Sequence, residues 1–331
     1  MRITRAWCVE LNEVVTIDVA RRVYLSLENP PSRFNFLCSN KACRDAEVRV
    51  VGANYRKAAE DGEKFQAAHF RHWIGDAHLQ DCEWLEDEAS GEQKPGESEE
   101  AFHQRRVRRK LSDYITTFDP RLDDDPGGDG KSDGPTGPGQ QPPEGGTPRP
   151  RGGGTPDDTP GETRSNDLER LVNNYREARE TLTWEEFQSL EIGIVGAARI
   201  RLANYFVPVT RGQHYPKQRV LYGGASFLKS YGQGFKLCFY DRIDGKRVYV
   251  YISSQQMLAY RFRKYLRGII DQIPLRRYVT VYAIGTVRQS QSGDSFDLIV
   301  DDVRQLALIL GPRRAETDST EKVEADDVNE R

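Results

Sequence analysis

Hydrophobic and polar residues alternate in the first part of the chain and then give way to helical spacing. Alternation in RAWCVELNEVVTIDVA, EVRVVGANY and QAAHFRHW predicts three strands of a small β-rich domain. Residues 97–117 then show helical spacing, with acidic residues early and basic residues late, as the helix dipole favours. We expect one apolar stripe on this helix, made of Phe102, Val107, Leu111, Tyr114 and Ile115.

The second half of the chain begins with helical spacing over residues 166–190, with Thr183 as the cap of a second short helix. Two hairpins follow, FKLCFYDRIDGKRVYVYIS around Asp244-Gly245 and YVTVYAIGTVRQSQSGDSFDLIVDDV around Ser292-Gly293-Asp294. Residues 253–273 lie between them and predict an amphipathic helix. Its expected inward face is Leu258, Phe262, Tyr265, Leu266 and Ile269. The order strand, strand, helix, strand, strand is typical of a small β-barrel of the OB type, although other small α+β folds remain open.

A stretch of Pro, Gly and acidic residues separates these two parts. It has almost no large apolar residue and cannot offset the entropy cost of ordering. We therefore expect residues 118–164 to be a disordered linker with a root-mean-square reach of roughly 35–40 Å. The acidic residues of the C-terminal end predict a disordered tail over 315–331.

Composition limits the class of protein and its compartment. The chain has 331 residues, enough for two domains, and a net charge of −3. No apolar run approaches the ~20 residues that span a bilayer, and the N-terminus lacks a signal-peptide core, so we expect a cytoplasmic protein with no membrane partner. Five cysteines in a reducing compartment favour a metal site or free thiols over disulfides.

Cysteines and histidines concentrate in one short region. Cys38 and Cys43 follow an apolar run, and three histidines and Cys82 follow within 45 residues of them. A structural zinc ion requires four nitrogen or sulfur ligands, and two spaced pairs supply them. We predict zinc bound by Cys38, Cys43, His72 and Cys82. The alternative is that these are buried free cysteines and surface histidines.

The choice of histidine depends on local structure. His69 and His72 lie three residues apart, so on a strand they face opposite sides. We prefer His72, because a turn follows it at residues 74–76; His69 or His78 is the substitute, and we expect His78 beside the metal or at the surface. Cys8 and Cys238 lie inside apolar runs and are expected to be inert core thiols.

The order of these motifs resembles the N-terminal region of competence CoiA-like proteins. The shared elements are the Cys-x4-Cys pair, His-Phe-Arg-His at 69–72, Cys82, and Glu97-Ser98 with His103 opening a helix. The resemblance covers residues 1 to about 115 and implies zinc binding in a bacterial protein. In that family a nuclease domain follows, with an Asp and a Glu-x-Lys that bind magnesium. Residues 115–314 have no such motif on the expected strands, so nuclease activity is not implied.

The C-terminal domain is strongly basic. Residues 192–314 hold 20 Lys and Arg against 7 Asp and Glu, a formal charge of +13, and 17 of the chain's 32 Phe, Tyr and Trp. Basic charge interleaved with aromatic rings is typical of single-strand binding, although most of the rings must also form the core. The candidate contacts are Arg211, Lys217, Arg219, Tyr222, Lys229, Tyr231, Lys246, Arg247, Arg261, Arg263, Lys264 and Arg267.

The sequence thus predicts an α+β, multidomain chain: a zinc-binding domain over 1–117, a linker over 118–164, a basic barrel-like domain over 165–314 and a tail over 315–331. We expect a zinc-stabilised nucleic-acid-binding protein, an accessory factor in DNA processing, mobile-element biology or phage defence, with single-stranded DNA or RNA favoured over duplex. One alternative is an adaptor that binds a protein partner. Another is a divergent nuclease, for which Asp294, Asp297, Asp301 and Asp302 are the acidic group near strands.

Overall fold

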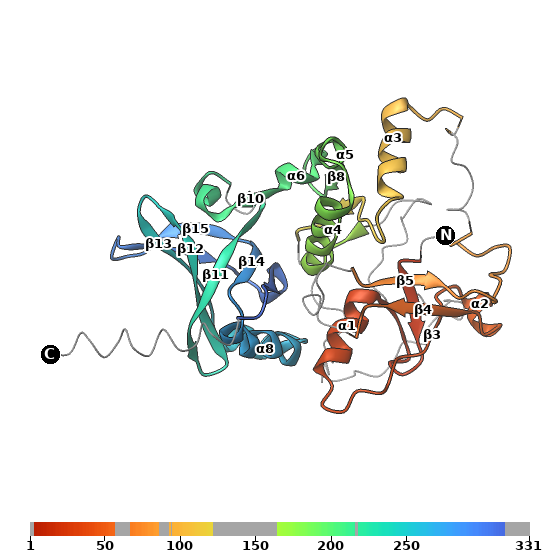
Figure 1. Cartoon of the computed structure of the whole chain (residues 1–331), viewed down its shortest axis with the longest axis horizontal. Helices are drawn as coiled ribbons and strands as arrows, with labels where there is room; N and C mark the ends of the chain where they lie inside the picture. The colour runs from red at the N-terminus through yellow and green to blue at the C-terminus, as the bar shows by residue number, and fades with distance from the viewer. Residues whose placement is uncertain are drawn as a thin grey trace, which may run out of the picture.

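The computed structural model describes residues 3–56, 67–85, 93, 95–121, 164–215 and 218–314. It confirms the α+β class, with three separate sheets distributed along the chain (Figure 1). Most of the expected linker, the expected tail and the candidate contact Lys217 lie outside the described residues.

The N-terminal module carries a five-stranded antiparallel sheet in the order β2-β1-β3-β4-β5. Its elements are β1 Arg5–Cys8, β2 Glu13–Thr16, α1 Ile17–Ser26, β3 Phe36–Cys38, α2 Lys41–Asp45, β4 Arg49–Ala53 and β5 His69–His72. The single strand expected over RAWCVELNEVVTIDVA is wrong, because the chain reverses near Asn12, whose φ is 53°, and enters a helix at Ile17. Thr16 caps that helix by accepting a hydrogen bond from the Val19 amide.

Aromatic packing forms the core of this module. Phe36 contacts both Phe70 and Tyr55 edge to face, with ring centroids 5.0 and 5.4 Å apart. Gly52 on β4 makes this packing possible, since a Cβ there would lie 2.7 Å from the Phe36 ring. A side chain at this position of β4 would therefore meet the aromatic core.

A middle layer contains the second sheet, in the order β7-β6-β8-β9. Its elements are α3 Glu99–Arg108, β6 Thr117–Phe118, β7 Arg164–Ser165, α4 Leu168–Thr181, α5 Trp184–Ser189, β8 Glu191–Ile194, β9 Ile200–Arg201 and α6 Leu202–Tyr205. Thr183 caps α5 and shares a capping box with Glu186, as predicted. The helix expected to reach residue 117 ends at Arg108. The apolar residues beyond it, such as Ile115, are buried in non-helical chain against α4, where the Asn174 side chain accepts a hydrogen bond from the Ile115 amide.

The large C-terminal sheet has the strand order β15-β16-β13-β12-β11-β14-β17, with β10 added beside β11. Its elements are β10 Phe206–Pro208, η2 Val209–His214, β11 Val220–Tyr231, β12 Gly234–Ile243, β13 Lys246–Ile252, α7 Ser254–Ala259, α8 Arg263–Gln272, η3 Ile273–Leu275, β14 Val279–Ile284, β15 Thr286–Gln289, β16 Ser295–Ile299, η4 Val303–Gln305 and β17 Leu306–Leu310. Both predicted hairpins are confirmed, as β12–β13 and β15–β16. Within the described residues the sheet does not close into a barrel, so the OB-type topology is not confirmed.

The helix expected over residues 253–273 is divided into α7 and α8. Leu258, expected to face inward, is 59% exposed, whereas Met257, Leu266 and Ile270 are buried in the core of the large sheet. Tyr265 points elsewhere, because its hydroxyl donates a 2.6 Å hydrogen bond to Glu169 of α4. The break thus allows α8 to contact the sheet on one side and the middle layer on the other.

Helix α4 lies between the N-terminal module and the large sheet (Figure 1). On one side Arg22 of α1 forms ion pairs with Asp167 and Glu169. On the other, Tyr175 of α4 stacks on Phe206, with ring centroids 3.8 Å apart. The two outer parts are thus both packed against α4, rather than joined only by the flexible linker that the sequence suggested. In the part of the chain that the structure describes, no helix is both long and apolar enough to cross a bilayer.

Candidate metal centre and exposed sheet face

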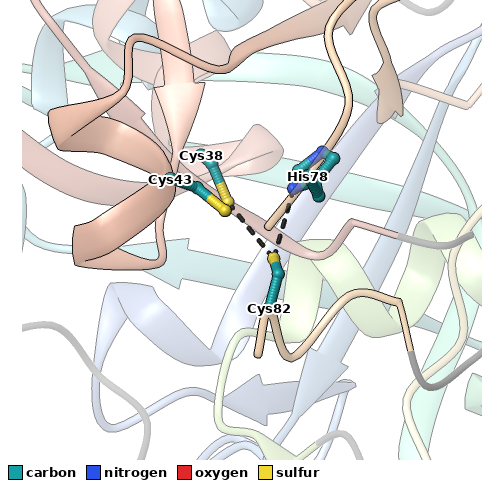
Figure 2. A group of neighbouring side chains, drawn as sticks. All are labelled: Cys38, Cys43, His78 and Cys82. Carbon is teal, nitrogen blue, oxygen red and sulfur yellow. Dashed lines mark hydrogen bonds between the residues drawn. The ribbon is translucent and has the colours of Figure 1, made fainter. Parts of the chain in front are cut away.

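Four buried side chains converge at one end of the N-terminal sheet: Cys38, Cys43, His78 and Cys82, which we call the Cys/His cluster (Figure 2). Their ligand atoms all lie within 4.8 Å of one another. The sulfur atoms of Cys38 and Cys82 are 3.7 Å apart, close to the ~3.8 Å edge of a tetrahedron with metal–sulfur bonds of ~2.3 Å. The Nδ1 atom of His78 lies 3.2 Å from the Cys82 sulfur. This arrangement can hold a metal ion.

Local backbone structure positions the two cysteines of the first pair. Cys38 is the last residue of β3, and Asn40 caps α2 by accepting a hydrogen bond from the Cys43 amide. The first turn of α2 therefore folds Cys43 back toward Cys38. The Leu79 amide then donates to the Cys43 sulfur over 3.3 Å, an interaction that stabilises a thiolate.

The second half of the cluster depends on a long-range contact. Asp76 accepts hydrogen bonds from the backbone and guanidinium of Arg49, at 2.8 to 3.0 Å, and these contacts lower the pKa of Asp76 to about 2. The segment after β5 is thereby fastened to β4. A tight turn, with the Cys82 amide donating to the Leu79 carbonyl, then brings Cys82 beneath His78.

Burial sets the protonation of these groups. It raises the pKa of the Cys38 and Cys82 thiols and lowers the pKa of His78, which His72 lowers further. A neutral imidazole is the form that binds a metal, and a bound cation stabilises buried thiolates. The Nε2 atom of His78 is buried and has no hydrogen-bond partner in the described structure. The donor set therefore fits a metal ion.

The histidine in this cluster is His78, which we predicted as a substitute ligand, and not the preferred His72. His72, the preferred ligand, is not part of the group; its ring lies 5.4 Å from that of His78, beside the cluster. His69 points to a different site, where its Nδ1 lies 3.0 Å from the Ala67 carbonyl. His78 lies in the non-strand segment after β5, which the Asp76–Arg49 contact fastens to β4, and the sequence does not reveal that contact. Of the remaining cysteines, Cys8 is buried and Cys238 half-buried, and both are free thiols.

A second candidate site is the outward side of the large sheet. Half of this side is covered, because Tyr222 and Tyr282 lie under α4. The other half carries outward side chains of β12, β13 and their neighbours, which we call the exposed sheet face: Lys229, Tyr231, Lys236, Tyr240, Arg242, Arg247, Tyr249, Tyr251 and Arg288. One carboxylate shares this face, because Asp297 of β16 is paired with both Tyr249 and Arg288. Strand pairing sets these positions opposite one another, for example Lys236 opposite Tyr251.

Cations and rings touch on this face. Lys236 lies 4.1 Å from the centre of the Tyr249 ring, and Lys229 lies 5.4 Å from that of Tyr231. Tyr231 also meets Tyr251 edge to face at 5.5 Å, and Tyr251 is 46% exposed. The rings therefore present accessible surfaces with positive charge beside them.

Positive charge also accumulates around Cys238 on the same face. Burial raises the pKa of the Cys238 thiol, while the positive charges of Arg247, Arg242 and Lys236 lower it. Arg242 and Arg247 are direct cross-strand partners. Like charges opposite each other on a sheet are destabilising, so this pairing favours a site that binds an anion.

The remaining candidate contacts lie in different environments. Lys246 packs over Phe296, Arg219 lies over Tyr215, and Arg211 is exposed in η2. On α8 and just before it, Arg261 pairs with Glu13 and Lys264 with Glu28, while Arg267 pairs with Asp271. Arg263 is exposed. The basic residues of this region are thus turned partly toward the N-terminal module.

Our sequence reasoning omitted several residues of the exposed sheet face, among them Lys236, Tyr240, Tyr249 and Tyr251. The signal was present in the alternation of FKLCFYDRIDGKRVYVYIS, which places every second residue outward. What the sequence could not supply is which half of the sheet α4 covers.

Comparison with known proteins gives little further information. No family model and no curated protein matches the chain. One solved structure, a putative aspartyl-tRNA synthetase from Leishmania major Friedlin, is similar over 33% of this chain and 21% of its own length, at 13% identity and a TM-score of 0.23. A TM-score of this size supports no argument about fold or function.

Proposed function

We propose that this chain binds single-stranded nucleic acid on the exposed sheet face and that a zinc ion in the Cys/His cluster stabilises its N-terminal module. One observation carries the proposal: accessible tyrosines alternate with cations across β12 and β13. Rings of this kind stack on bases, and the cations between them follow the phosphates. Duplex DNA offers no free base faces, so single strands suit this surface better.

Zinc is the ion that the donor set favours. Three thiolates and one imidazole suit zinc, whereas magnesium and calcium prefer oxygen ligands. All four donors are protein side chains, so the ion has no open position and its role is structural. The CoiA-like resemblance supports the same metal and supplies no other part of the proposal.

The nuclease alternative has weaker support. Asp302 pairs with Arg304 and caps η4, and therefore has a structural role. In the described residues, none of the aspartates near the strands belongs to a metal-binding group. An adaptor remains the second candidate, because exposed tyrosines and arginines are also enriched at protein interfaces.

Fluorescence anisotropy of the full chain, with labelled single-stranded DNA, single-stranded RNA and duplex DNA over a salt series, tests the proposal. If the five cations Lys229, Lys236, Arg242, Arg247 and Arg288 contact phosphates, the slope of log affinity against log salt is about −3.5 for single strands. No binding to any of the three at low salt would refute the proposal and favour the adaptor.

Two pairs of substitutions separate charge from stacking. The double variant Lys236→Gln, Arg247→Gln removes two phosphate contacts and should make the slope of log affinity against log salt about 1.4 shallower. The double variant Tyr249→Ser, Tyr251→Ser should weaken the binding free energy by about 1–3 kcal/mol for each stacked base that is lost, with the salt slope unchanged. Trp184→Ser is the matched control, because Trp184 is 69% exposed on α5, outside this face. Arg263→Gln tests whether α8 contributes.

A further inference from the structure

The five-stranded sheet of the N-terminal module has a second side, which faces away from the aromatic core. A solvated side of an antiparallel sheet normally carries polar residues. Here strand pairing aligns one outward residue from each of four neighbouring strands in a row across β2, β1, β3 and β4: Val14, Trp7, Leu37 and Arg49. The first three are half-buried and Arg49 is exposed, so the row is accessible although most of it is apolar.

Arginine and tryptophan side chains meet along this row. The guanidinium of Arg44, on α2, lies 4.2 Å from the centre of the Trp7 ring. At the other end of the row the guanidinium of Arg49 lies 4.7 Å from the centre of the ring of Trp73, the residue after β5. Together with two outward arginines on β1 and β5 they form what we call the arginine/tryptophan face: Arg5, Trp7, Arg44, Arg49, Arg71 and Trp73.

Most of the positive charge on this face has no carboxylate partner. Arg49 pairs with Asp76. Arg5, Arg44 and Arg71 form no ion pair within the described residues, although two exposed acidic residues follow Arg44 in the chain. Three guanidinium groups are therefore available to an anionic ligand.

We propose that the arginine/tryptophan face is a second contact surface for single-stranded nucleic acid. Indole rings and guanidinium planes both stack on bases, and arginine binds phosphate through two parallel hydrogen bonds. The class of ligand rests on the proposed function, but the residues are a separate set, on the module that lies across α4 from the large sheet (Figure 1). A strand held on one face meets the other as an intramolecular contact, which raises the overall affinity.

The strand lies toward the Arg44 and Trp73 end of this side of the sheet. At the opposite end His69, the first residue of β5, lines a pocket together with Glu177 and Glu180 of α4. These carboxylates repel phosphate, so that end of the sheet is unsuitable for the strand.

Intrinsic tryptophan fluorescence distinguishes this face from the exposed sheet face. The chain has four tryptophans, at positions 7, 73, 84 and 184, and the exposed sheet face contains none of them. Stacking on a base quenches an indole, so oligothymidylate should quench the fluorescence of the full, zinc-loaded chain saturably. Trp73→Phe should roughly halve this quenching, because one of two stacking indoles is lost. Trp184→Phe, at a 69% exposed position on α5, is the matched control and should leave it unchanged.

Substitution of the arginines tests the phosphate contacts. The double variant Arg44→Gln, Arg71→Gln should make the slope of log affinity against log salt, measured by quenching, about 1.4 shallower. Arg33→Gln, at an exposed position in the loop between α1 and β3, is the control and should keep the parental slope. If circular dichroism shows that the double variant does not fold, Arg71→Gln alone replaces it, with a slope about 0.7 shallower.

Binding in the anisotropy assay without tryptophan quenching would overturn this proposal while the proposed function stands, and an acidic protein surface would then be the better partner for this face. Quenching with the parental salt slope in the double variant would also overturn it. If quenching persists but substitutions on the exposed sheet face leave binding unchanged, the proposed function fails and this proposal stands.

Discussion

Replacing Arg22 by methionine tests whether the N-terminal module is fastened to helix α4. Arg22 is 6% exposed, and its Nε atom donates a 2.9 Å hydrogen bond to Glu169. A second nitrogen pairs with Asp167, and the guanidinium lies 5.2 Å from the Phe262 ring centre. Methionine keeps the apolar stem and removes the charge. The substitution therefore isolates the ionic contribution to this junction.

The structure sets the size of the effect. Breaking a buried ion pair by removing one partner costs about 3–5 kcal/mol, because the other charge stays buried. Here Asp167 and Glu169 remain, with side chains 19% and 14% exposed. Each keeps another partner: Asp167 accepts from the amides of Glu169 and Arg170, and Glu169 from Tyr265. We therefore expect the lower end, about 3 kcal/mol.

Urea unfolding followed by circular dichroism measures this change, and hydrogen exchange locates it. Arg22→Met should lower the free energy of unfolding and expose amides of α1. Lys41→Met, an exposed residue of α2, should change the free energy by no more than about 0.5 kcal/mol. If Arg22→Met lowers the free energy of unfolding by less than about 1 kcal/mol and the amides of α1 stay protected from exchange, the reasoning is refuted. The N-terminal module would then be tethered to the rest of the chain without a stabilising ionic contact.

Three further predictions concern the metal, the core and pH. Cys82→Ser should lose the bound zinc, measured by plasma mass spectrometry, and with it the free energy of zinc binding, which is about 10–16 kcal/mol in zinc-finger peptides. The control Cys238→Ser, at a half-buried position, should keep one full equivalent, and retention of zinc by Cys82→Ser would contradict the assignment. Gly52→Ala should destabilise by about 1–3 kcal/mol in urea, since its Cβ would lie 2.7 Å from Phe36, whereas Gly268→Ala, with no atom within 4 Å, should be neutral or stabilising. Burial raises the pKa of Asp18 from its ordinary value of 3.8 to about 7, so between these pH values the folded state holds a proton that the unfolded state has released. Stability should therefore fall as pH rises from about 4 to 7 and level off above 7, with zinc saturating, and Asp18→Asn should flatten that dependence; an unchanged dependence would exclude Asp18 as its source.

Local signals in the sequence were sufficient for the hairpins and caps. Asp244 and Gly245 both have positive φ, 49° and 76°, as the turn of the β12–β13 hairpin requires, and aromatic alternation flanks them. Thr183 and Glu186 form a capping box within four residues. These features depend on neighbours in the chain, so periodicity and turn chemistry revealed them.

Local signals did not select the histidine of the Cys/His cluster: they favoured His72 and gave His78 only as a substitute. The segment that carries His78 is fastened by Asp76, which binds Arg49 on β4, 27 positions earlier. His72 has the better local context, on a strand and before a turn, yet its ring lies beside the site. Cysteine spacing revealed three of the four clustered residues, whereas the position of the imidazole depended on a tertiary contact.

The packing of the N-terminal module against α4 was also hidden. Arg22 and Asp167 are 145 residues apart, and in the sequence each resembles a residue on the solvated face of a helix. The Pro- and Gly-rich stretch between them suggested independent modules. Charge complementarity between buried faces leaves no periodic signal, so the sequence overestimated the freedom of the two parts.

Photocrosslinking tests the central claim most directly. The full chain would be irradiated with 4-thiothymidine-containing single-stranded DNA and the crosslinked peptides mapped by mass spectrometry. We predict crosslinks on β12 and β13, at Tyr240, Tyr249 or Tyr251, that disappear at high salt. Crosslinks confined to α8 or to the N-terminal module, or none at all, would contradict the assignment of the exposed sheet face.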